Sequence, residues 1–280
     1  MGLGGYLTWT ASAREIRKLA GNSAKILPIE RHGPFIKIIS SEIFDNNDDF
    51  VSASELEQNC VLYPLVLNNP DANYCKKDTP EKAHHRSDKH IIEQIADVYS
   101  LPDVEKRCFI DHWDRHAVDK IVQDHIGTED FLTIEPISKT NYTKNRVYPF
   151  EKWQNIVNSL CDDIKIAQVG ATGSRLLENT IDLTGKTSFI NSAALIGRSK
   201  LFLSSEGGLV HAATAFDTKS VVVITGYQSE EMVAYPQNIN VNISKHGPCG
   251  LKGECPECRK EAEEHDWKEI VEIVKEELCL

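Results

Sequence analysis

The sequence predicts an α/β protein whose largest part is a doubly wound parallel sheet with helices on both faces. Between residues 128 and 225, apolar runs of strand length alternate with segments whose apolar residues recur at the period of a helix. The run at residues 220–225 is β-branched and almost wholly apolar, as in strands that are buried on both faces. Glycine-containing turns separate strands from the segments that follow them.

The N-terminal end gives weaker signals. Gly2, Gly4 and Gly5 precede a helical pattern that continues to Leu19. A glycine loop that enters a helix is a contact site for phosphate or sugar. A strand would ordinarily feed such a loop and none precedes it, so we expect either a truncated start or a domain without its first strand. The alternative is a flexible N-terminal tail.

Before residue 128 we expect strands at residues 25–30, 35–39 and 60–67, and helices at residues 91–99 and 112–126. Pro64 indicates that the third strand lies at an edge or bends, because proline cannot donate a hydrogen bond to a neighbouring strand. The loop before the first of these helices contains His84, His85 and His90, which we expect to be solvated.

After residue 128 we expect strands at residues 131–134, 165–169, 200–204 and 220–225, a helix that opens at Pro149, and another around residues 193–196. A polar loop that contains Lys144 and Arg146 precedes the first of these helices. The predicted domains are therefore residues 1–127, residues 128–245, and a Cys-rich knuckle with a C-terminal helix at residues 246–280.

The segment around residues 204–213 has the pattern of a strand, a glycine turn and a helix. Gly207 and Gly208 allow close approach of a ligand to the backbone, and the free amides of the new helix favour phosphate. Glu206 can accept hydrogen bonds from sugar or ribose hydroxyls, and His211 falls one turn into the helix. The alternative is a helix entry built of small residues for packing alone.

Charge and apolar content exclude two classes of partner. The formal net charge is −11, and the acidic excess is spread along the chain without a basic face for nucleic acid. No apolar run approaches the length of about 20 residues that a membrane helix needs. Because nothing at the N-terminus resembles a signal peptide, we expect a cytoplasmic protein without a transmembrane segment.

Four of the eight cysteines, Cys60, Cys75, Cys108 and Cys161, are scattered and read as reduced thiols. The other four, Cys249, Cys255, Cys258 and Cys279, crowd the last 32 residues, where a structural metal site is favoured over disulfides.

Cys255 and Cys258 form a Cys-x-x-Cys pair, and Cys249 can supply a third ligand. Cys279 can reach them only if the last helix folds back, and His246 and His265 compete for the fourth position. We expect such a site to lie far from Glu206. The alternative is a redox-active or merely reduced pair.

Four segments, in order, resemble the heptosyltransferase-like glycosyltransferases of family 9. They are residues 2–5, residues 144–153, residues 182–188 and residues 206–213. The resemblance implies a GT-B-like architecture, in which two Rossmann-like doubly wound domains face a cleft, here with an abbreviated N-terminal domain. It also implies transfer of a heptose-like sugar from a nucleotide-diphosphate sugar to an acceptor hydroxyl, with inversion and without a metal at the reaction.

The resemblance assigns binding roles to particular residues. Lys144 or Arg146 takes the place of the family's phosphate-binding lysine, and Glu206 takes that of a conserved aspartate. The substrate-binding residues that follow are Gly4, Gly5, Lys144, Arg146, Glu206, Gly207, Gly208 and His211. Some autotransporter heptosyltransferases of this kind carry a cysteine-ligated iron near the C-terminus, so zinc and iron are both open for the cysteine cluster.

The catalytic base is the main departure from the family. Gly5 stands where family members have the aspartate thought to act on the acceptor, and glycine cannot remove a proton. Glu30, His32 and Glu135 are the candidate replacements. The alternatives are a non-catalytic module that binds nucleotide sugars or glycans, and an assembly subunit. The expected partners are a nucleotide sugar, an acceptor that is a glycan, a lipid-linked saccharide or a protein, and further copies of the chain.

Overall fold

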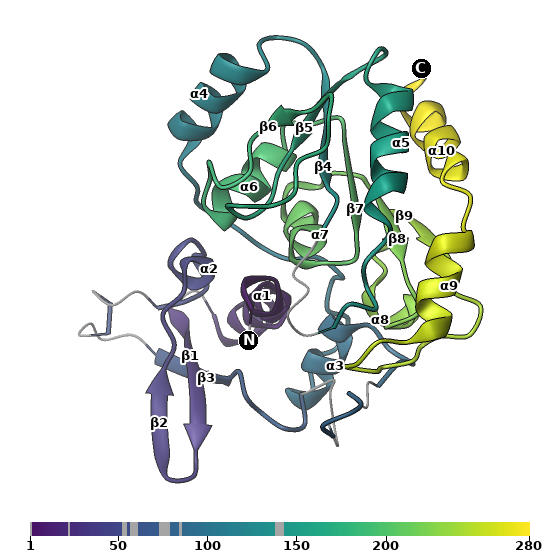
Figure 1. The fold of residues 1–280 in the computed structure, drawn as a ribbon. Helices are drawn as coiled ribbons and strands as arrows, with labels where there is room; N and C mark the ends of the chain where they lie inside the picture. The colour runs from purple at the N-terminus through teal and green to yellow at the C-terminus, as the bar shows by residue number, and fades with distance from the viewer. Residues whose placement is uncertain are drawn as a thin grey trace.

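The computed structural model describes residues 2–21, 23–51, 55–56, 61–72, 79–83, 86–137 and 143–280. Cys60, Cys75, His84 and His85 lie outside the described residues. In this part of the chain the protein has a large parallel sheet with helices on both faces, and a smaller mixed sheet beside it (Figure 1). The prediction of an α/β fold is confirmed.

The larger sheet has six parallel strands in the order β6-β5-β4-β7-β8-β9. Their bounds are β4 Phe131–Glu135, β5 Lys165–Gln168, β6 Ile181–Asp182, β7 Leu201–Ser205, β8 Ser220–Ile224 and β9 Ile239–Asn242. Counted within this sheet, the order is 3-2-1-4-5-6, that of dinucleotide-binding Rossmann domains. The direction of winding therefore reverses between β4 and β7.

Helices cover both faces of this sheet (Figure 1). On one face, α5 (Phe150–Leu160) and α10 (Lys268–Leu278) pack together over alternate strand residues such as Leu132 and Ile134. On the other face lie α6 (Phe189–Ile196), α7 (Gly208–Ala213) and α4 (Arg115–His125). Trp153 of α5 is fully buried, which stabilises its face by roughly 1.5–3 kcal/mol.

The smaller sheet has three strands in the order β2-β1-β3. β1 (Ala24–His32) pairs antiparallel with β2 (Phe35–Ile38) and parallel with β3 (Val61–Val66). Pro64 lies in β3 at an edge, as predicted. The remaining elements are α2 Glu42–Asp45, α3 Ile91–Val98, η1 Thr214–Phe216, α8 Glu230–Val233 and α9 Pro256–Glu264.

Helix α1 (Leu3–Ala20) lies between the two sheets and contacts α7, α3 and β1 (Figure 1). A β-carbon on Gly4 would stand 2.4 Å from the Cα of Gly208, so this crossing of α1 and α7 requires glycine. The prediction of a glycine loop before the helix is wrong for Gly4 and Gly5, because both lie inside the first turn of α1. One hydrophobic cluster joins α1 to the face of the large sheet that carries α6 and α7.

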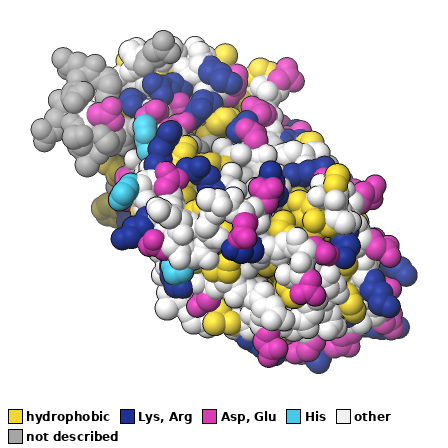
Figure 2. All heavy atoms as spheres, turned by 90° about the horizontal axis from the view of Figure 1, so that it is seen from above, with side chains coloured by type: hydrophobic (Ala, Val, Ile, Leu, Met, Phe, Trp, Pro, Cys, Tyr) yellow, Lys and Arg dark blue, Asp and Glu magenta, His cyan; other side chains and the backbone are white. Residues whose placement is uncertain are grey.

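The surface shows both signs of charge close together. On the face in Figure 2, Lys and Arg side chains are interspersed with Asp and Glu. Among the described residues, no helix combines the length and apolar character needed to span a membrane.

Candidate functional site

The reversal of winding brings two carboxyl groups to neighbouring strand ends. Glu135 is the last residue of β4, and Glu206 follows the last residue of β7. The two strands are adjacent and parallel, with Glu135 paired in register with Ser204. Ligands of open α/β sheets bind outside the carboxyl ends of the strands at such a reversal.

Three carboxyl oxygens here are buried and lack hydrogen-bond partners among the described residues. They are Oε2 of Glu135 and both oxygens of Glu206, a residue that is only 3% exposed. Burial raises the pKa of Glu135 to about 8 and that of Glu206 to about 7, against the opposing charge of Arg146. Because buried polar groups are normally paired, these oxygens are suited to bind a ligand.

Arg146 provides the positive charge of this site. Its guanidinium lies 5.9 Å from the centre of the Tyr227 ring and is close enough to lower the pKa values of Glu135, Glu206 and His211. Lys144 differs, because its side chain is 73% exposed and pairs with Glu254 at 3.5 Å. The structure thus brings Arg146, but not Lys144, into electrostatic contact with the buried carboxyl groups.

His211 is held by a tyrosine that the sequence did not reveal. Its Nδ1 lies 2.7 Å from the hydroxyl of Tyr235, and burial lowers the pKa of His211 to about 4. Burial raises the pKa of Tyr235 well above 10, so the hydroxyl stays protonated and forms a neutral hydrogen bond with His211 Nδ1.

Two further residues surround Tyr235. The Cys108 thiol lies 3.8 Å from its hydroxyl, and the His90 ring packs edge-on against it at 4.8 Å. His90 is 1% exposed and caps α3, so the prediction of a solvated side chain is wrong at this position. His90 at the start of α3 packs against Tyr235 in the loop after α8, and this contact between distant segments brings His90 near His211.

The other predicted residues lie on nearby elements. Gly207 has an extended backbone, with φ of 178°, and opens the six-residue helix α7. Nε2 of His32 lies within hydrogen-bonding distance of Glu30 Oε2, at 3.2 Å, near the end of β1. Burial raises the pKa of Tyr6, and the charge of Glu30 raises it further, so Glu30 faces the first turn of α1.

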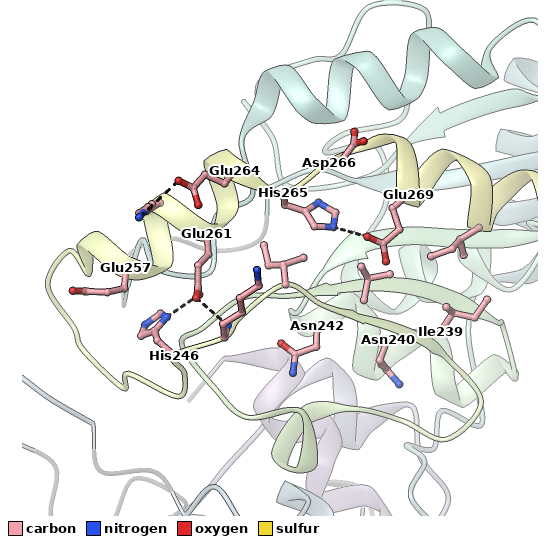
Figure 3. A pocket seen from close by; sticks show the side chains of 15 residues that line it. Ile239, Asn240, Asn242, His246, Glu257, Glu261, Glu264, His265, Asp266 and Glu269 are labelled. Atoms are coloured by element: carbon pink, nitrogen blue, oxygen red, sulfur yellow. Dashed lines mark hydrogen bonds and ion pairs between the residues drawn. The ribbon is translucent and has the colours of Figure 1, made fainter.

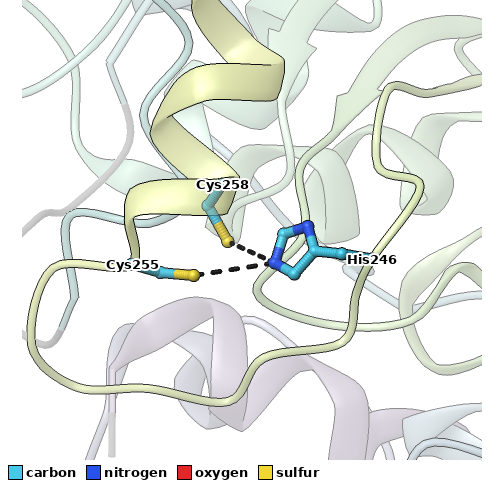
Figure 4. Close-up of side chains that lie close together, drawn as sticks. All are labelled: His246, Cys255 and Cys258. Carbon is cyan, nitrogen blue, oxygen red and sulfur yellow. Dashed lines mark hydrogen bonds between the residues drawn. The ribbon is translucent and has the colours of Figure 1, made fainter.

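A second candidate site is formed by residues 246–258, which we name the Cys/His loop. Nε2 of His246 lies 3.6 Å from the sulfur atoms of both Cys255 and Cys258 (Figure 4). The ligand atoms of these three residues all lie within 4.8 Å of one another, and Cys249 Sγ is 3.4 Å from Cys258 Sγ. A tetrahedral ion bound at about 2.3 Å to sulfur and about 2.0 Å to nitrogen separates its ligands by about 3.5–3.8 Å. The separations among His246, Cys255 and Cys258 therefore fit three ligands of a structural metal, and Cys249 lies next to one of them.

Glu261 and the N-terminal end of α9 orient and polarise the candidate metal ligands. Nδ1 of His246 lies 2.7 Å from Glu261 Oε2, which keeps the Nε2 lone pair directed at the sulfur atoms. Cys255 caps α9 and Cys258 lies in its first turn, where the helix dipole favours thiolates. The hydrogen bond between Cys249 and Cys258 lowers the pKa of Cys249 and raises that of Cys258, so the Cys249 thiol is the first of the pair to ionise.

The structure corrects the predicted ligand set. Cys279 caps the far end of α10 and is exposed, because α9 and α10 lead the chain away from the Cys/His loop. His265 bonds to the hydroxyl of Tyr148 at 2.9 Å instead. His246, which the sequence offered as a competing ligand, takes the position beside the cysteines.

The expectation that this site lies far from Glu206 is also wrong. The backbone N–H of Cys249 donates to the carbonyl of Gly226, just beyond β8, at 2.7 Å. The charge of Cys249 raises the pKa of Glu206. A β-carbon on Gly226 would lie 2.7 Å from the His246 ring and 3.0 Å from Cys258 Sγ, so only glycine admits the loop here.

A groove of about 870 Å³ runs between β9 and the helices α9 and α10 (Figure 3). Glu261 and His246 stand at one end of it, and His265 pairs with Glu269 at 3.3 Å further along. The groove is separate from the buried carboxyl groups, none of which line it.

Glu206→Gln should make the protein more stable at pH 8 and leave its stability at pH 4 nearly unchanged. The folded pKa of Glu206, about 7, lies above the ordinary 4.5, so the carboxylate opposes folding once the pH exceeds that ordinary value. The difference between these two pKa values corresponds to a gain of at most ~3 kcal/mol in the free energy of unfolding of the variant at pH 8. Urea unfolding at the two pH values measures the effect. Glu151→Gln, at a side chain 75% exposed, is the control, and equal gains in both variants would contradict the prediction.

Comparison with known proteins agrees with this fold. The family model for glycosyltransferase family 9 (heptosyltransferase) matches residues 81–263, well over half of the chain. No curated protein matches the sequence.

Three solved structures are similar at low identity, which shows a shared fold. The iron-containing heptosyltransferase TibC of enterotoxigenic E. coli, dodecameric and in complex with ADP-D-β-D-heptose, is 13% identical at a TM-score of 0.67, over 100% of this chain and 74% of that one. A family 9 glycosyl transferase of Veillonella parvula is 13% identical at a TM-score of 0.63, over 100% and 95%.

The third is the E. coli ADP-heptose LPS heptosyltransferase II, 12% identical at a TM-score of 0.52. The match covers 68% of this chain and 62% of that enzyme. The extent of the family match, together with the Rossmann strand order, shows that this chain belongs to glycosyltransferase family 9.

Proposed function

We propose that the protein transfers a heptose-like sugar from a nucleotide-diphosphate sugar to an acceptor hydroxyl, with inversion and without a metal at the reacting centre. The observation that carries the proposal is the pair of buried carboxyl groups beside Arg146 at the reversal of the large sheet. A sugar nucleotide supplies both hydroxyls for the carboxyl groups and a diphosphate for the guanidinium.

Each group has a role in this proposal. Arg146 binds the diphosphate and stabilises the charge that develops on the leaving group. Glu206 accepts hydrogen bonds from donor hydroxyls, and Glu135, whose pKa is about 8, donates its proton to an oxygen of the donor at neutral pH. His211, held by Tyr235 through Nδ1, offers Nε2 for a hydrogen bond to the donor. Lys144 lies at the rim, and Gly207 gives the backbone its extended entry into α7.

We propose Glu30 as the base that removes the acceptor proton, with His32 orienting it. Gly5 has no side chain to serve, but the charge of Glu30 acts on the neighbouring Tyr6, and Glu30 lies 3.2 Å from Nε2 of His32. Glu135 is less suited, since it lies under the same arginine that binds the leaving diphosphate.

We also propose that His246, Cys249, Cys255 and Cys258 hold one structural ion, zinc or iron. Four protein ligands leave no open position for substrate, so the ion acts as a cross-link of the Cys/His loop. TibC, which is similar in fold, is an iron-containing enzyme.

The remaining expectations are part of the same proposal. We propose domains at residues 1–127 and 128–245, followed by the knuckle and helix at residues 246–280, in a cytoplasmic protein. The acceptor is a glycan, a lipid-linked saccharide or a protein. Since TibC is dodecameric, self-association of this chain is proposed as well.

Calorimetric titration with ADP and with a panel of nucleotide-diphosphate sugars tests the function. Arg146→Gln should weaken ADP binding by about 10- to 150-fold, the equivalent of a charged hydrogen bond of about 1.5–3 kcal/mol. Lys144→Gln, two residues away and exposed, should change it less than about threefold. The reverse order of effects would contradict the assignment of Arg146. Donor binding without transfer to any acceptor would favour the non-catalytic alternative.

A further inference from the structure

Asn145, the residue before Arg146, is buried against the Cys/His loop. It is only 7% exposed, and its side-chain Nδ2 donates to the carbonyls of Leu251 and Gly253, both at 2.8 Å. Its Oδ1 accepts the backbone N–H of Cys255 at 2.9 Å. One amide side chain therefore binds three backbone groups of the segment that carries the metal ligands.

The backbone around Asn145 is tied to the same elements. Its carbonyl accepts a hydrogen bond from the hydroxyl of Thr225, at the end of β8, at 2.8 Å. Thr143, at the other side, donates from Oγ1 to the carbonyl of Leu251 at 3.1 Å. Residues 143–149, which we name the basic loop, thus meet the Cys/His loop through both a hydroxyl and a carboxamide.

The three backbone groups that hold Asn145 stand between metal ligands. Leu251 and Gly253 lie between Cys249 and Cys255, and the third group belongs to Cys255 itself. A bound ion fixes both ends of this seven-residue stretch, so the carbonyls and the amide keep the spacing that a planar carboxamide needs. Without the ion, the same three groups have more conformations available.

We propose that Asn145 is a positioning residue that couples metal occupancy of the Cys/His loop to binding of the nucleotide donor through Arg146. The inference rests on the proposed function for its ligand. The ordered loop holds Asn145, and Asn145 holds the next residue, Arg146, beside Glu206. Coupling of this kind is reciprocal, so the donor should also tighten metal binding by the same factor.

The decisive experiment measures this factor in both directions. ADP affinity is determined by calorimetry for the metal-loaded protein and after chelation, and metal affinity is determined by competition with a coloured chelator with and without ADP. We expect the metal to raise ADP affinity about 5- to 150-fold, and ADP to raise metal affinity equally.

Asn145→Asp should reduce this factor to about one. The carboxylate keeps the size of the side chain but replaces the two N–H donors with acceptors facing the carbonyls of Leu251 and Gly253. Glu151→Gln, at a side chain of α5 that is 75% exposed and pairs with Arg175 rather than with the Cys/His loop, should keep the full factor. If Asn145→Asp does not fold, Thr143→Val removes the other contact with Leu251 and should lower the factor in part.

Hydrogen exchange gives a readout that needs no nucleotide. In the parent protein, chelation should speed exchange of the backbone amide of Val147, which donates to Lys144 within the basic loop. In Asn145→Asp the exchange should already be fast and should not respond to the metal. Equal coupling in a folded Asn145→Asp variant, or exchange that ignores chelation in the parent, would overturn the inference. Failure of the parent to bind ADP would overturn the proposed function alone.

Discussion

Cys258→Ser should abolish metal binding and lower the melting temperature of the protein by more than about 10 °C. Structural zinc contributes an apparent ~10–16 kcal/mol in small metal-folded peptides, and serine is a poor ligand for it. Here the large sheet folds around its own cores, so only part of that free energy appears as global stability. A loss of several kcal/mol corresponds to a shift of about 2–4 °C for each kcal/mol in a chain of this size.

Metal analysis of protein purified under reducing conditions and without a His-tag checks this result. The parent should hold about one ion per chain, and Cys258→Ser less than a tenth of one. Cys279→Ser is the matched control, because that thiol is exposed at the far end of α10. Loss of metal in Cys279→Ser, with retention in His246→Gln, would contradict the ligand set seen in the structure.

The large sheet could be predicted from the sequence because its signals are local. Strands such as β8 are continuous β-branched runs, and α5 carries its apolar residues at helical spacing. The sequence pattern does not predict β6 and β9. β6 has two residues, and β9 alternates asparagine with apolar side chains because it lies at an edge.

The candidate site was only partly predictable, because its supporting contacts join distant segments. A motif of adjacent residues placed Glu206 and His211 together, but Tyr235 reaches His211 from 24 positions away. The metal site shows the same limit. The sequence favours Cys279 as a ligand because it is a cysteine near the others. In the structure, α9 and α10 carry Cys279 away, and His246 lies beside Cys255 and Cys258.

Glycine positions show why local motifs can mislead. Gly4 and Gly208 read as ligand-binding glycines, but in the structure they let two helices touch at the backbone. The same contact places the first turn of α1, which includes Gly5, beside the first turn of α7, the helix that follows β7. These glycines can therefore be required for helix packing and also lie beside the candidate site.

Glu30→Gln should lower kcat by about 10²- to 10⁴-fold and leave donor affinity nearly unchanged. A positioned general base contributes about this factor, and glutamine keeps the shape of the side chain but cannot take a proton. Glu135→Gln should lower kcat far less, because the pKa of about 8 keeps that carboxyl protonated at neutral pH and glutamine imitates a neutral hydrogen-bond donor. His32→Gln should give an intermediate loss, because it removes the partner of Glu30 at 3.2 Å.

Steady-state transfer assays with the donor that binds in titration measure these effects, alongside calorimetric donor affinities. Gly5→Asp in the Glu30→Gln background supplies a carboxylate on the first turn of α1 and should restore part of the lost turnover. A large loss in Glu135→Gln with normal turnover in Glu30→Gln would instead assign the base to the end of β4. Equal and normal turnover in all three variants would mean that no candidate removes the proton. The acceptor hydroxyl would then have to be activated by a group outside this set.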